Sequence, residues 1–327
     1  MQKKNVAVIC GGFTAEKNIS MGSGAVVEKN IDQQLYNVFK IIVEENGCFV
    51  SPENIMVDMR DFSFLQEGNK IKFDLVFNAI HGSPGEDGKI QGYFDMMKIP
   101  YTNCGVATSA LTFNKTWTKT VLGDTVLKAP GYLVQNDKIA INTALGEIPK
   151  SLKLPIFVKP NNNGSSYGIS KIKDFAQLEG AIKDALKFDK EVLVEQGIIG
   201  KEVTCGVYQY KGEIIVLPIC EILTDKHEFF DYTAKYTSGE SDEIIPARIP
   251  ETEKILVEQY STAIYTKLGC KGVVRIDYII DEGKPYFLEV NTVPGLSEAS
   301  IVPKMAAASG LTLKEFFGRL LEEAKAG

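Results

Sequence analysis

Residues 272–300 read GVVRIDYIIDEGKPYFLEVNTVPGLSEAS and contain two β-rich runs separated by Asp281-Glu282-Gly283. Four polar side chains interrupt these otherwise apolar runs: Arg275, Asp277, Glu289 and Asn291. A three-residue turn with Gly283 in the left-handed conformation would pair odd-numbered residues with odd-numbered residues, which places all four side chains on one face. Two carboxylates and a carboxamide on one face predict a site for a hard cation of the Mg²⁺ type, because such cations take oxygen ligands. The alternative is a solvated sheet face with a surface ion pair.

The composition is that of an ordinary globular protein. The chain has 327 residues, enough for two or three domains that each have their own core. Hydrophobic residues make up 44% and charged residues 24%, so we expect folding without disulfides. The net charge of −6 argues against a general nucleic-acid or anionic-membrane surface, because such surfaces are usually basic. An anionic substrate would need lysines or arginines placed locally.

The six cysteines are scattered, without a CxxC pair, and several lie inside apolar runs. This pattern predicts buried free thiols rather than disulfides or a zinc site, and hence a reducing, cytoplasmic location. The apolar run at residues 6–10 is too short for the core of a signal peptide. No apolar run approaches the roughly 20 residues that span a bilayer, so we expect no membrane partner.

The N-terminal part has the pattern of an α/β unit. Residues 5–10 predict a buried strand, and further strands are predicted at 38–43 and 73–80, which indicates an open, mainly parallel sheet. Ligands bind such sheets at the carboxyl ends of the strands, where polar loops follow here. In these loops, Glu16 could bind an ammonium group and His81 a substrate. The alternatives are a first-turn helix glutamate and a structural histidine.

A glycine- and serine-rich loop, KPNNNGSSYG (159–168), lies between two predicted strands. Small residues let backbone N–H groups approach phosphate oxygens closely, and Lys159 would supply positive charge. The spacing of a Walker A loop is absent. The segment therefore indicates phosphate binding by a flexible flap, with a solvent-exposed hairpin as the alternative.

The C-terminal part alternates strands and helices around one long loop. Strands are predicted at 191–196, 202–210 and 213–223, and a helix at 251–268 closes with Gly269. Between them, residues 224–250 have no clear period, and a loop of this length is more often a functional lid than a connector. Its Lys- and Tyr-containing segment could close over bound phosphate and exclude water.

Eight segments, taken in order, resemble the D-alanine–D-alanine ligases of the ATP-grasp superfamily: GGFTAEKNIS, HGSPGEDGKIQG, LTFNKTWTK, FVKPNNNGSSYGISK, EQGIIGKEVTCGV, FFDYTAKYTSG, RIDY and LEVNTVPGLSEAS. The resemblance runs over nearly the whole chain. It implies an α/β fold, α+β in its ATP-grasp part. An N-terminal open parallel α/β domain (1–105) would precede a two-domain ATP-grasp fold. That fold would consist of a central subdomain (106–190) and a C-terminal catalytic domain (191–327) with a lid at 224–250.

The resemblance also implies the reaction ATP + 2 D-alanine → D-alanyl-D-alanine + ADP + phosphate. Phosphoryl transfer would activate one carboxylate, and the amine of a second D-alanine would then attack the acyl phosphate. The implied nucleotide contacts are Lys115 and Lys159 at the phosphates, Lys235 at the γ-phosphate, Glu195 at the adenine amino group and Glu202 at the ribose.

Two Mg²⁺ ions are implied as cofactors beside ATP, with Mn²⁺ able to substitute, and their ligands would be Asp277, Glu289 and Asn291. The tetrahedral oxyanion would be stabilised by Arg275 and by the backbone N–H of Gly295. Arg275 suits this role because its guanidinium is permanently charged.

The implied substrate contacts come from five parts of the chain. Glu16 would receive the ammonium group of the first D-alanine, with His81 nearby. Ser165 and Tyr236 would form a hydrogen-bonded network with Glu16, and Ser300 would hold the second carboxylate. In this family Tyr236 resembles the residue of the dipeptide-forming enzymes, which predicts an amide rather than an ester product.

Several alternatives stay open. Glu298 precedes Ser300 by two residues and could repel the second substrate, so another ATP-grasp ligase is the nearest alternative. A nucleotide-binding module without catalysis would not need Arg275, and a nicotinamide-dependent dehydrogenase would need the absent GxGxxG motif. The expected role is cytoplasmic synthesis of a peptidoglycan precursor. The enzyme would be a homodimer, as is common among relatives, with no nucleic-acid partner.

Overall fold

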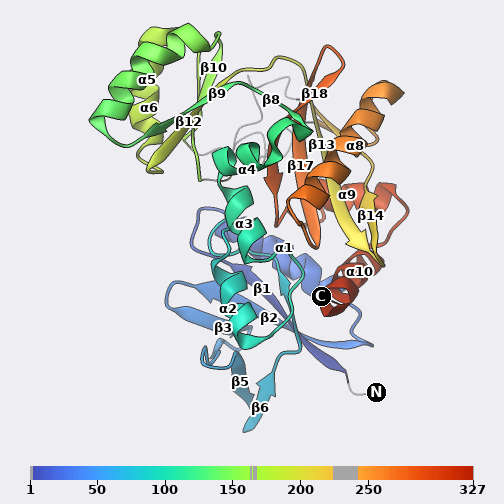
Figure 1. Cartoon of the computed structure of the whole chain (residues 1–327). Coiled ribbons are helices and arrows are strands. Elements are labelled where there is room, and N and C mark those ends of the chain that lie inside the picture. Colours follow the sequence, from blue (N-terminus) through green and yellow to red (C-terminus); the bar gives the residue numbers. More distant parts are fainter. Residues whose placement is uncertain (1–2, 163, 165–167, 224–241, 327) are drawn as a thin grey trace.

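The computed structural model describes residues 3–162, 164, 168–223 and 242–326. Its strands form three larger sheets, of five, four and seven strands, and one two-stranded hairpin. Figure 1 shows the five-stranded sheet at the bottom, the four-stranded sheet at the upper left and the seven-stranded sheet at the upper right. None of the described helices combines the length and the apolar character needed to cross a membrane.

The five-stranded sheet is built from the N-terminal part of the chain. It contains β1 (Lys4–Gly11), β2 (Tyr36–Glu44), β3 (Gly47–Ser51), β4 (Ile55–Met56) and β7 (Leu75–Asn78), in the order β4-β3-β2-β1-β7. β1 is parallel to β2 and β7, whereas β3 and β4 pair antiparallel. The predicted parallel centre is confirmed, and the antiparallel edge is an addition. Two helices, α1 (Lys17–Asn30) and α2 (Lys89–Met97), follow β1 and β7, and a hairpin is formed by β5 (Ser63–Gln66) and β6 (Asn69–Lys72).

The four-stranded sheet is antiparallel. Along the chain, its strands come after β8 (Leu127–Lys128) and before β13 (Lys201–Tyr210), both of which belong to the seven-stranded sheet. The strands of the four-stranded sheet, in the order β11-β10-β12-β9, are β9 (Gly131–Gln135), β10 (Ile156–Pro160), β11 (Ser170–Ile172) and β12 (Glu191–Gln196). Helices α5 (Lys138–Ser151) and α6 (Leu178–Ala185) pack against it, with the η2 turn (Phe175–Gln177) leading into α6. β12 pairs on both sides within this sheet, so the predicted boundary at residue 190 cuts through it. We therefore extend the central segment to Gln196.

Two short helices connect the N-terminal sheet to the rest. They are α3 (Val106–Phe113) and α4 (Lys115–Leu122), followed by the η1 turn (Gly123–Thr125) and β8 (Leu127–Lys128). α4 begins at Lys115 because the side chain of Asn114 caps it by accepting a hydrogen bond from the Trp117 N–H (2.9 Å). In Figure 1, α4 lies between the two upper sheets.

The seven-stranded sheet has helices on both faces. Its strands are β8, β13 (Lys201–Tyr210), β14 (Glu213–Val216), β15 (Cys220–Leu223), β16 (Asp242–Ile244), β17 (Val273–Asp281) and β18 (Lys284–Asn291). α8 (Glu251–Lys267) covers one face, and α9 (Ile301–Ala308) and α10 (Leu313–Ala326) cover the other. α10 also packs on the N-terminal sheet, where Phe317 contacts Phe77 (centroids 5.5 Å apart).

The predicted lid is only partly described. β15 pairs with β16, so residues 242–244 form a strand and not part of an irregular loop. Residues 224–241 lie outside the described residues. All six cysteines are buried free thiols, which confirms their predicted state.

The β17–β18 hairpin differs from its prediction at the turn. Asp281 pairs with Lys284, so the turn has two residues, Glu282 (φ 47°) and Gly283 (φ 77°), both left-handed. The register then shifts between Asp277 and Tyr278 through a bulge at Leu288. Between the turn and the bulge, odd-numbered residues of β17 face even-numbered residues of β18; beyond the bulge they face odd-numbered residues. The three-residue turn was wrong, but the predicted shared face is present because the bulge restores it.

Candidate active site

Four polar side chains lie at the end of the β17–β18 hairpin that is away from its turn. We call them the carboxylate face: Arg275, Asp277, Glu289 and Asn291. Arg275 is directly opposite Asn291, and Asp277 is opposite Glu289. The Asp277 carboxylate accepts two hydrogen bonds from Arg275 (2.9 Å each) and one from Asn291 Nδ2 (3.0 Å). Since Asp277 is only 6% exposed, the alternative of a surface ion pair is excluded.

Thr204 also contributes to this face and was not predicted. It lies on β13 directly opposite Asp277 and donates its hydroxyl to Asp277 Oδ1 (2.5 Å). The available sequence signal was a Thr within the mostly apolar run VTCGV; the structure buries it fully, so its hydroxyl needs a partner. Asp277 is therefore held from both neighbouring strands.

The donor types of the carboxylate face fit a hard divalent cation. Within the described part of the chain, no group of three or more His, Cys, Asp or Glu side chains could hold a metal ion. The candidate set on this face therefore combines two carboxylates with the carboxamide of Asn291, all of which offer oxygen ligands. The guanidinium of Arg275 and the amide of Asn291 now satisfy the Asp277 oxygens. A bound cation would supply the same positive charge to those oxygens.

A group of three lysines and one glutamate lies beside the carboxylate face. We call it the lysine cluster: Lys115, Lys119, Lys159 and Glu195. Lys115 and Lys119 are one turn apart on α4 and so share a helix face. Glu195 on β12 accepts from Lys119 through one oxygen and pairs with Lys159 through the other. Lys115 Nζ lies 3.5 Å from Glu289 Oε2, which joins the cluster to the carboxylate face.

The lysine cluster is buried and, among the residues that the structure describes, combines three lysines with one glutamate. Lys119 and Lys159 have side chains that are 11% and 12% exposed, and they share the single carboxylate of Glu195. Burial lowers the pKa of Lys119 to about 8; Glu195 opposes this shift, and Lys159 and Lys115 add to it. Burial alone would raise the pKa of Glu195, but Lys119 and Lys159 outweigh it and bring the value to about 2. Lys119 was not predicted as a site residue.

Two asparagines of the glycine-serine loop hydrogen-bond to the start of α4, the helix that carries Lys115 and Lys119. Asn161 Oδ1 accepts from the Thr116 N–H (3.0 Å), and Asn162 Oδ1 accepts from Asn114 Nδ2 (2.8 Å). Asn161 is fully buried. These contacts hold the start of α4 against the end of β10, and therefore Lys115 near Lys159.

A second group of predicted residues meets on the N-terminal side. A Cβ atom on Gly82 would lie 2.9 Å from Glu16 Oε2, and one on Gly164 would lie 3.3 Å from it. Glu16 is therefore enclosed by the histidine-containing loop and the glycine-serine loop. His81 is buried, with Nδ1 2.8 Å from the Val293 carbonyl and Nε2 2.9 Å from Ser23 Oγ. Both ring nitrogens thus have protein partners.

Gly295 and Ser300 are adjacent in the loop that follows β18. A Cβ atom on Gly295 would lie 2.7 Å from Ser300 Oγ, so the close approach requires glycine. Glu298 pairs with Lys29 at 3.3 Å, and both side chains are largely exposed. An exposed, paired carboxylate is screened by water, which reduces the repulsion predicted for a second substrate.

Comparisons with known proteins agree with this arrangement. A family model described as "D-ala D-ala ligase N-terminus" matches residues 5–104, and one described as "D-ala D-ala ligase C-terminus" matches residues 128–322. A D-alanine–D-alanine ligase from Flavobacterium johnsoniae is 45% identical over 322 residues, 98% of each chain. The chain belongs to the D-alanine–D-alanine ligase family.

Solved structures of the family have the same fold, the ATP-grasp fold. The VanG D-Ala:D-Ser ligase from Enterococcus faecalis is 31% identical, with a TM-score of 0.87 over 99% of this chain and 100% of that one. A D-alanine–D-alanine ligase from Bacillus anthracis, complexed with ATP, is 27% identical, with a TM-score of 0.77 over 100% and 98%. The predicted fold class is therefore confirmed.

Four predicted site residues are still to be placed: Glu202, Ser165, Lys235 and Tyr236. Glu202 lies half-buried on β13, the strand next to β17. Ser165, Lys235 and Tyr236 lie outside the described residues. Their predicted roles stay predictions for this member of the ligase family.

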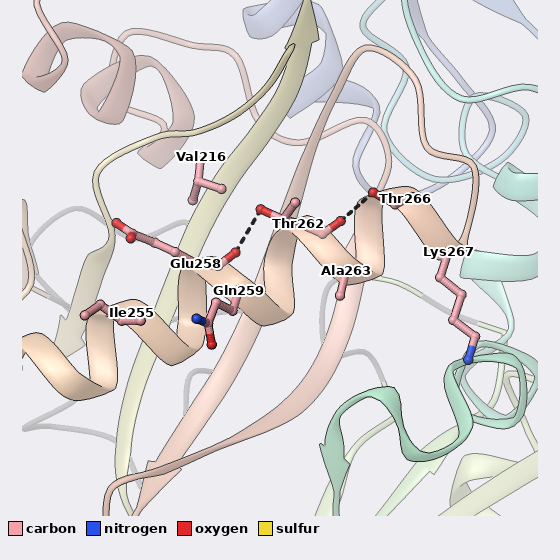
Figure 2. Close-up of a pocket in the computed structure, with 8 residues that line it drawn as sticks. All are labelled: Val216, Ile255, Glu258, Gln259, Thr262, Ala263, Thr266 and Lys267. Carbon is pink, nitrogen blue, oxygen red and sulfur yellow. Dashed lines mark hydrogen bonds between the residues drawn. The ribbon is translucent and has the colours of Figure 1, made fainter. Parts of the chain in front are cut away.

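A pocket of about 880 Å³ lies elsewhere, on the outer face of α8 (Figure 2). Figure 2 shows Thr262 and Thr266 bonded to carbonyls of their own helix, at Glu258 and Thr262 respectively. Lys267 bonds to the Leu122 carbonyl and to Thr125. Few polar groups therefore remain to converge on a ligand, and none of the predicted site residues lines this pocket.

Proposed function

We propose that the chain ligates two D-alanines to D-alanyl-D-alanine with ATP, through an acyl-phosphate intermediate, for peptidoglycan precursor synthesis. The observation that carries this proposal is the buried lysine cluster beside the carboxylate face, joined by Lys115 and Glu289. Buried excess positive charge is unfavourable unless an anion compensates it. ATP carries such an anion, and the relatives named above include a ligase complexed with ATP.

The reaction has two bond-making steps. A carboxylate oxygen of the first D-alanine bonds to the γ-phosphorus of ATP while the bond to the bridging oxygen breaks, and ADP leaves. The amine of the second D-alanine then attacks the carbonyl carbon, loses a proton, and phosphate leaves with the carboxylate oxygen. Charge grows on phosphoryl oxygens first and on a tetrahedral oxyanion second.

The phosphates would lie against Lys115 and Lys159, with Lys119 adding charge from the same helix face. Glu195 would accept the adenine amino group once ATP phosphates replace it as the partner of Lys159. Glu202 would bind the ribose, and Lys235 the γ-phosphate.

Asp277, Glu289 and Asn291 would hold Mg²⁺, with Mn²⁺ as a substitute. Two such ions would neutralise and orient the phosphates. Arg275 lies beside Asp277 and would meet the oxyanion together with the Gly295 N–H.

The substrates would lie between the N-terminal loops and the loop after β18. Glu16, enclosed by two loops, would bind the first ammonium group with His81 nearby, and Ser300 the second carboxylate. Ser165 and Tyr236 would complete the network around Glu16. A homodimer in the cytoplasm is part of the same proposal.

The test is phosphate release from ATP with a panel of D-alanine, D-serine and D-lactate, with products identified by mass spectrometry. D-serine belongs in the panel because a 31% identical structural relative is a D-Ala:D-Ser ligase. We expect D-alanine alone to stimulate phosphate release and to give D-alanyl-D-alanine. Failure of D-alanine to stimulate release would contradict the proposal, and a D-alanyl-D-lactate product at neutral pH would overturn the amide prediction.

A further inference from the structure

The N-terminal part of the chain holds the loop after β18 on both sides of the Pro294-Gly295 dipeptide. Before the dipeptide, the Val293 N–H donates to Glu86 Oε1 (3.1 Å), and the Val293 carbonyl lies 2.8 Å from His81 Nδ1. Both polar groups of this peptide are thus held by side chains that lie more than 200 residues away in sequence.

After the dipeptide, the Leu296 N–H donates to Ser23 Oγ (3.1 Å). Ser23 lies on α1 and is fully buried. We call Ser23, His81 and Glu86 the interdomain clasp, because all three belong to the N-terminal sheet region and all hold the loop of the C-terminal part.

The clasp is connected internally. Burial lowers the pKa of His81, so its ring is neutral and has one donor and one acceptor. Nδ1 faces a carbonyl and must donate, which leaves Nε2 to accept from the Ser23 hydroxyl (2.9 Å). The Ser23 oxygen then accepts from Leu296, so each group has one defined direction.

Glu86 also connects the clasp to the first-substrate region. Its second oxygen accepts from the Gly82 N–H (2.8 Å), and Gly82 lies against Glu16. Burial and the nearby Glu16 raise the pKa of Glu86 to about 7, while the Gly82 and Val293 N–H groups favour its ionised form. One buried side chain therefore spans from the loop around Glu16 to Val293.

We infer that Ser23, His81 and Glu86 are positioning residues. They hold the Gly295 N–H where it can donate to the oxyanion that forms when the second amine attacks the carbonyl carbon. This inference rests on the proposed function. Gly295 has no side chain to fix its own peptide, and a donor stabilises an oxyanion only where it is held in advance. The clasp supplies that restraint from both sides.

The clasp should matter most in the second chemical step. Phosphoryl transfer to the first carboxylate depends on the lysine cluster and the metal ligands, whereas the Ser23 hydroxyl bonds to His81 and to the Leu296 N–H. The oxyanion forms only when the second amine attacks. Loss of the clasp should therefore slow dipeptide formation and leave phosphoryl transfer nearly intact.

The experiment measures both steps in Ser23→Ala. Dipeptide formation is followed by mass spectrometry, and reversible phosphoryl transfer by positional isotope exchange in ATP labelled at the β,γ-bridging oxygen, with D-alanine present. A misplaced donor costs about 10- to 100-fold in rate. We expect that loss in dipeptide formation, with isotope exchange changed by less than about threefold.

Ser20→Ala is the matched control. Ser20 lies on the same helix, is equally buried, and makes two hydrogen bonds of 2.8 Å, to the Gly11 N–H and the Ala79 carbonyl. Its loss should leave the ratio of the two rates at the wild-type value, whatever it does to folding. An equal fall of both rates in Ser23→Ala would overturn the inference.

Glu86→Gln is the second variant, should Ser23→Ala fail to fold; both rates are measured at saturating D-alanine, because Glu86 also bonds to the loop around Glu16. The amide keeps one acceptor oxygen and loses one of two N–H partners, so the same change in rate ratio is expected, and an unchanged ratio would contradict the inference. If the wild-type protein shows neither isotope exchange nor dipeptide, the proposed function fails instead.

Discussion

The carboxylate face and the lysine cluster are neighbours that balance their charges differently. In the carboxylate face, Asp277 is matched by Arg275, Thr204 and Asn291 with distances of 2.5–3.0 Å. In the lysine cluster, one carboxylate serves two buried lysines. In the first region the buried charge of Asp277 already has protein partners, whereas in the second two described lysines share one carboxylate and a bound anion would add negative charge. Removing a cation should therefore cost much more stability in the carboxylate face than in the lysine cluster.

The largest effect is expected for Arg275→Met. Asp277 would stay buried without its cationic partner, which costs about 3 kcal/mol of unfolding free energy. Loss of an oxyanion donor should lower the ligation rate by about 10²- to 10³-fold. Urea denaturation and phosphate release measure the two losses.

Arg60→Met is the control for that prediction. Arg60 pairs with Asp58 at 2.7 Å, but its side chain is 90% exposed. Water screens an exposed pair, so both stability and ligation should stay close to wild type. Similar losses in the two variants would contradict the distinction between buried and exposed pairs.

Lys119→Met should weaken the binding of ATP without lowering the stability of the free protein. Glu195 would keep Lys159 as its partner, so we expect the unfolding free energy to change by less than about 1 kcal/mol. The affinity for a non-hydrolysable ATP analogue should fall about 10-fold, because each charge-assisted contact contributes roughly 1.5 kcal/mol. Calorimetric titration measures this affinity.

Glu195→Gln gives the opposite change in the same cluster. It removes the carboxylate that two buried lysines share and should lower stability by about 3 kcal/mol, the cost of removing one partner of a buried ion pair. Equal stability of the two variants would show that the cluster has no excess charge.

A smaller effect is expected from pH. The pKa of Lys119 is lowered to about 8 by burial, in a cluster that also contains Glu195, Lys159 and Lys115. Bound phosphates favour the charged lysine and raise this pKa, so binding takes up a proton above pH 8. The affinity for the ATP analogue should fall by up to about tenfold per pH unit from about 8 upward. Lys119→Met should remove this dependence; its persistence would assign it to another group.

The smallest effect is expected for Glu298→Gln. The pair with Lys29 is exposed, so stability should change by less than about 1 kcal/mol. The KM for the second D-alanine should stay within about twofold, because water screens a charge at this distance from the buried site. A larger fall in KM would mean that Glu298 does repel the substrate.

The sequence predicted the carboxylate face because polar residues in buried strands are conspicuous. The four side chains share a face only if odd-numbered residues of one strand pair with odd-numbered residues of the other. A two-residue turn with a bulge at Leu288 gives the same pairing there as the predicted three-residue turn. A bulge has no distinct sequence signal, since it depends on how neighbouring strands pack. The sequence did not show that β12 joins the four-stranded sheet for a similar reason, because its pairing with β10 and β9 is a non-local property.

Lys119 and the interdomain clasp could not be predicted from local patterns. Lys119 looks like any exposed helix lysine until the four-stranded sheet brings Glu195 beside it. Ser23 lies in a small-residue helix whose pattern gives no indication of Leu296 as a partner. Such contacts join segments that are distant in sequence, so only the tertiary structure defines them.

The most direct test of the proposed chemistry uses D-alanine labelled with ¹⁸O in its carboxylate. If the first carboxylate attacks the γ-phosphorus and phosphate later leaves with that oxygen, each phosphate released carries one ¹⁸O atom per dipeptide formed. Mass spectrometry of the phosphate reads this directly. We predict that labelled phosphate forms in step with D-alanyl-D-alanine; unlabelled phosphate accompanying dipeptide formation would contradict the acyl-phosphate route.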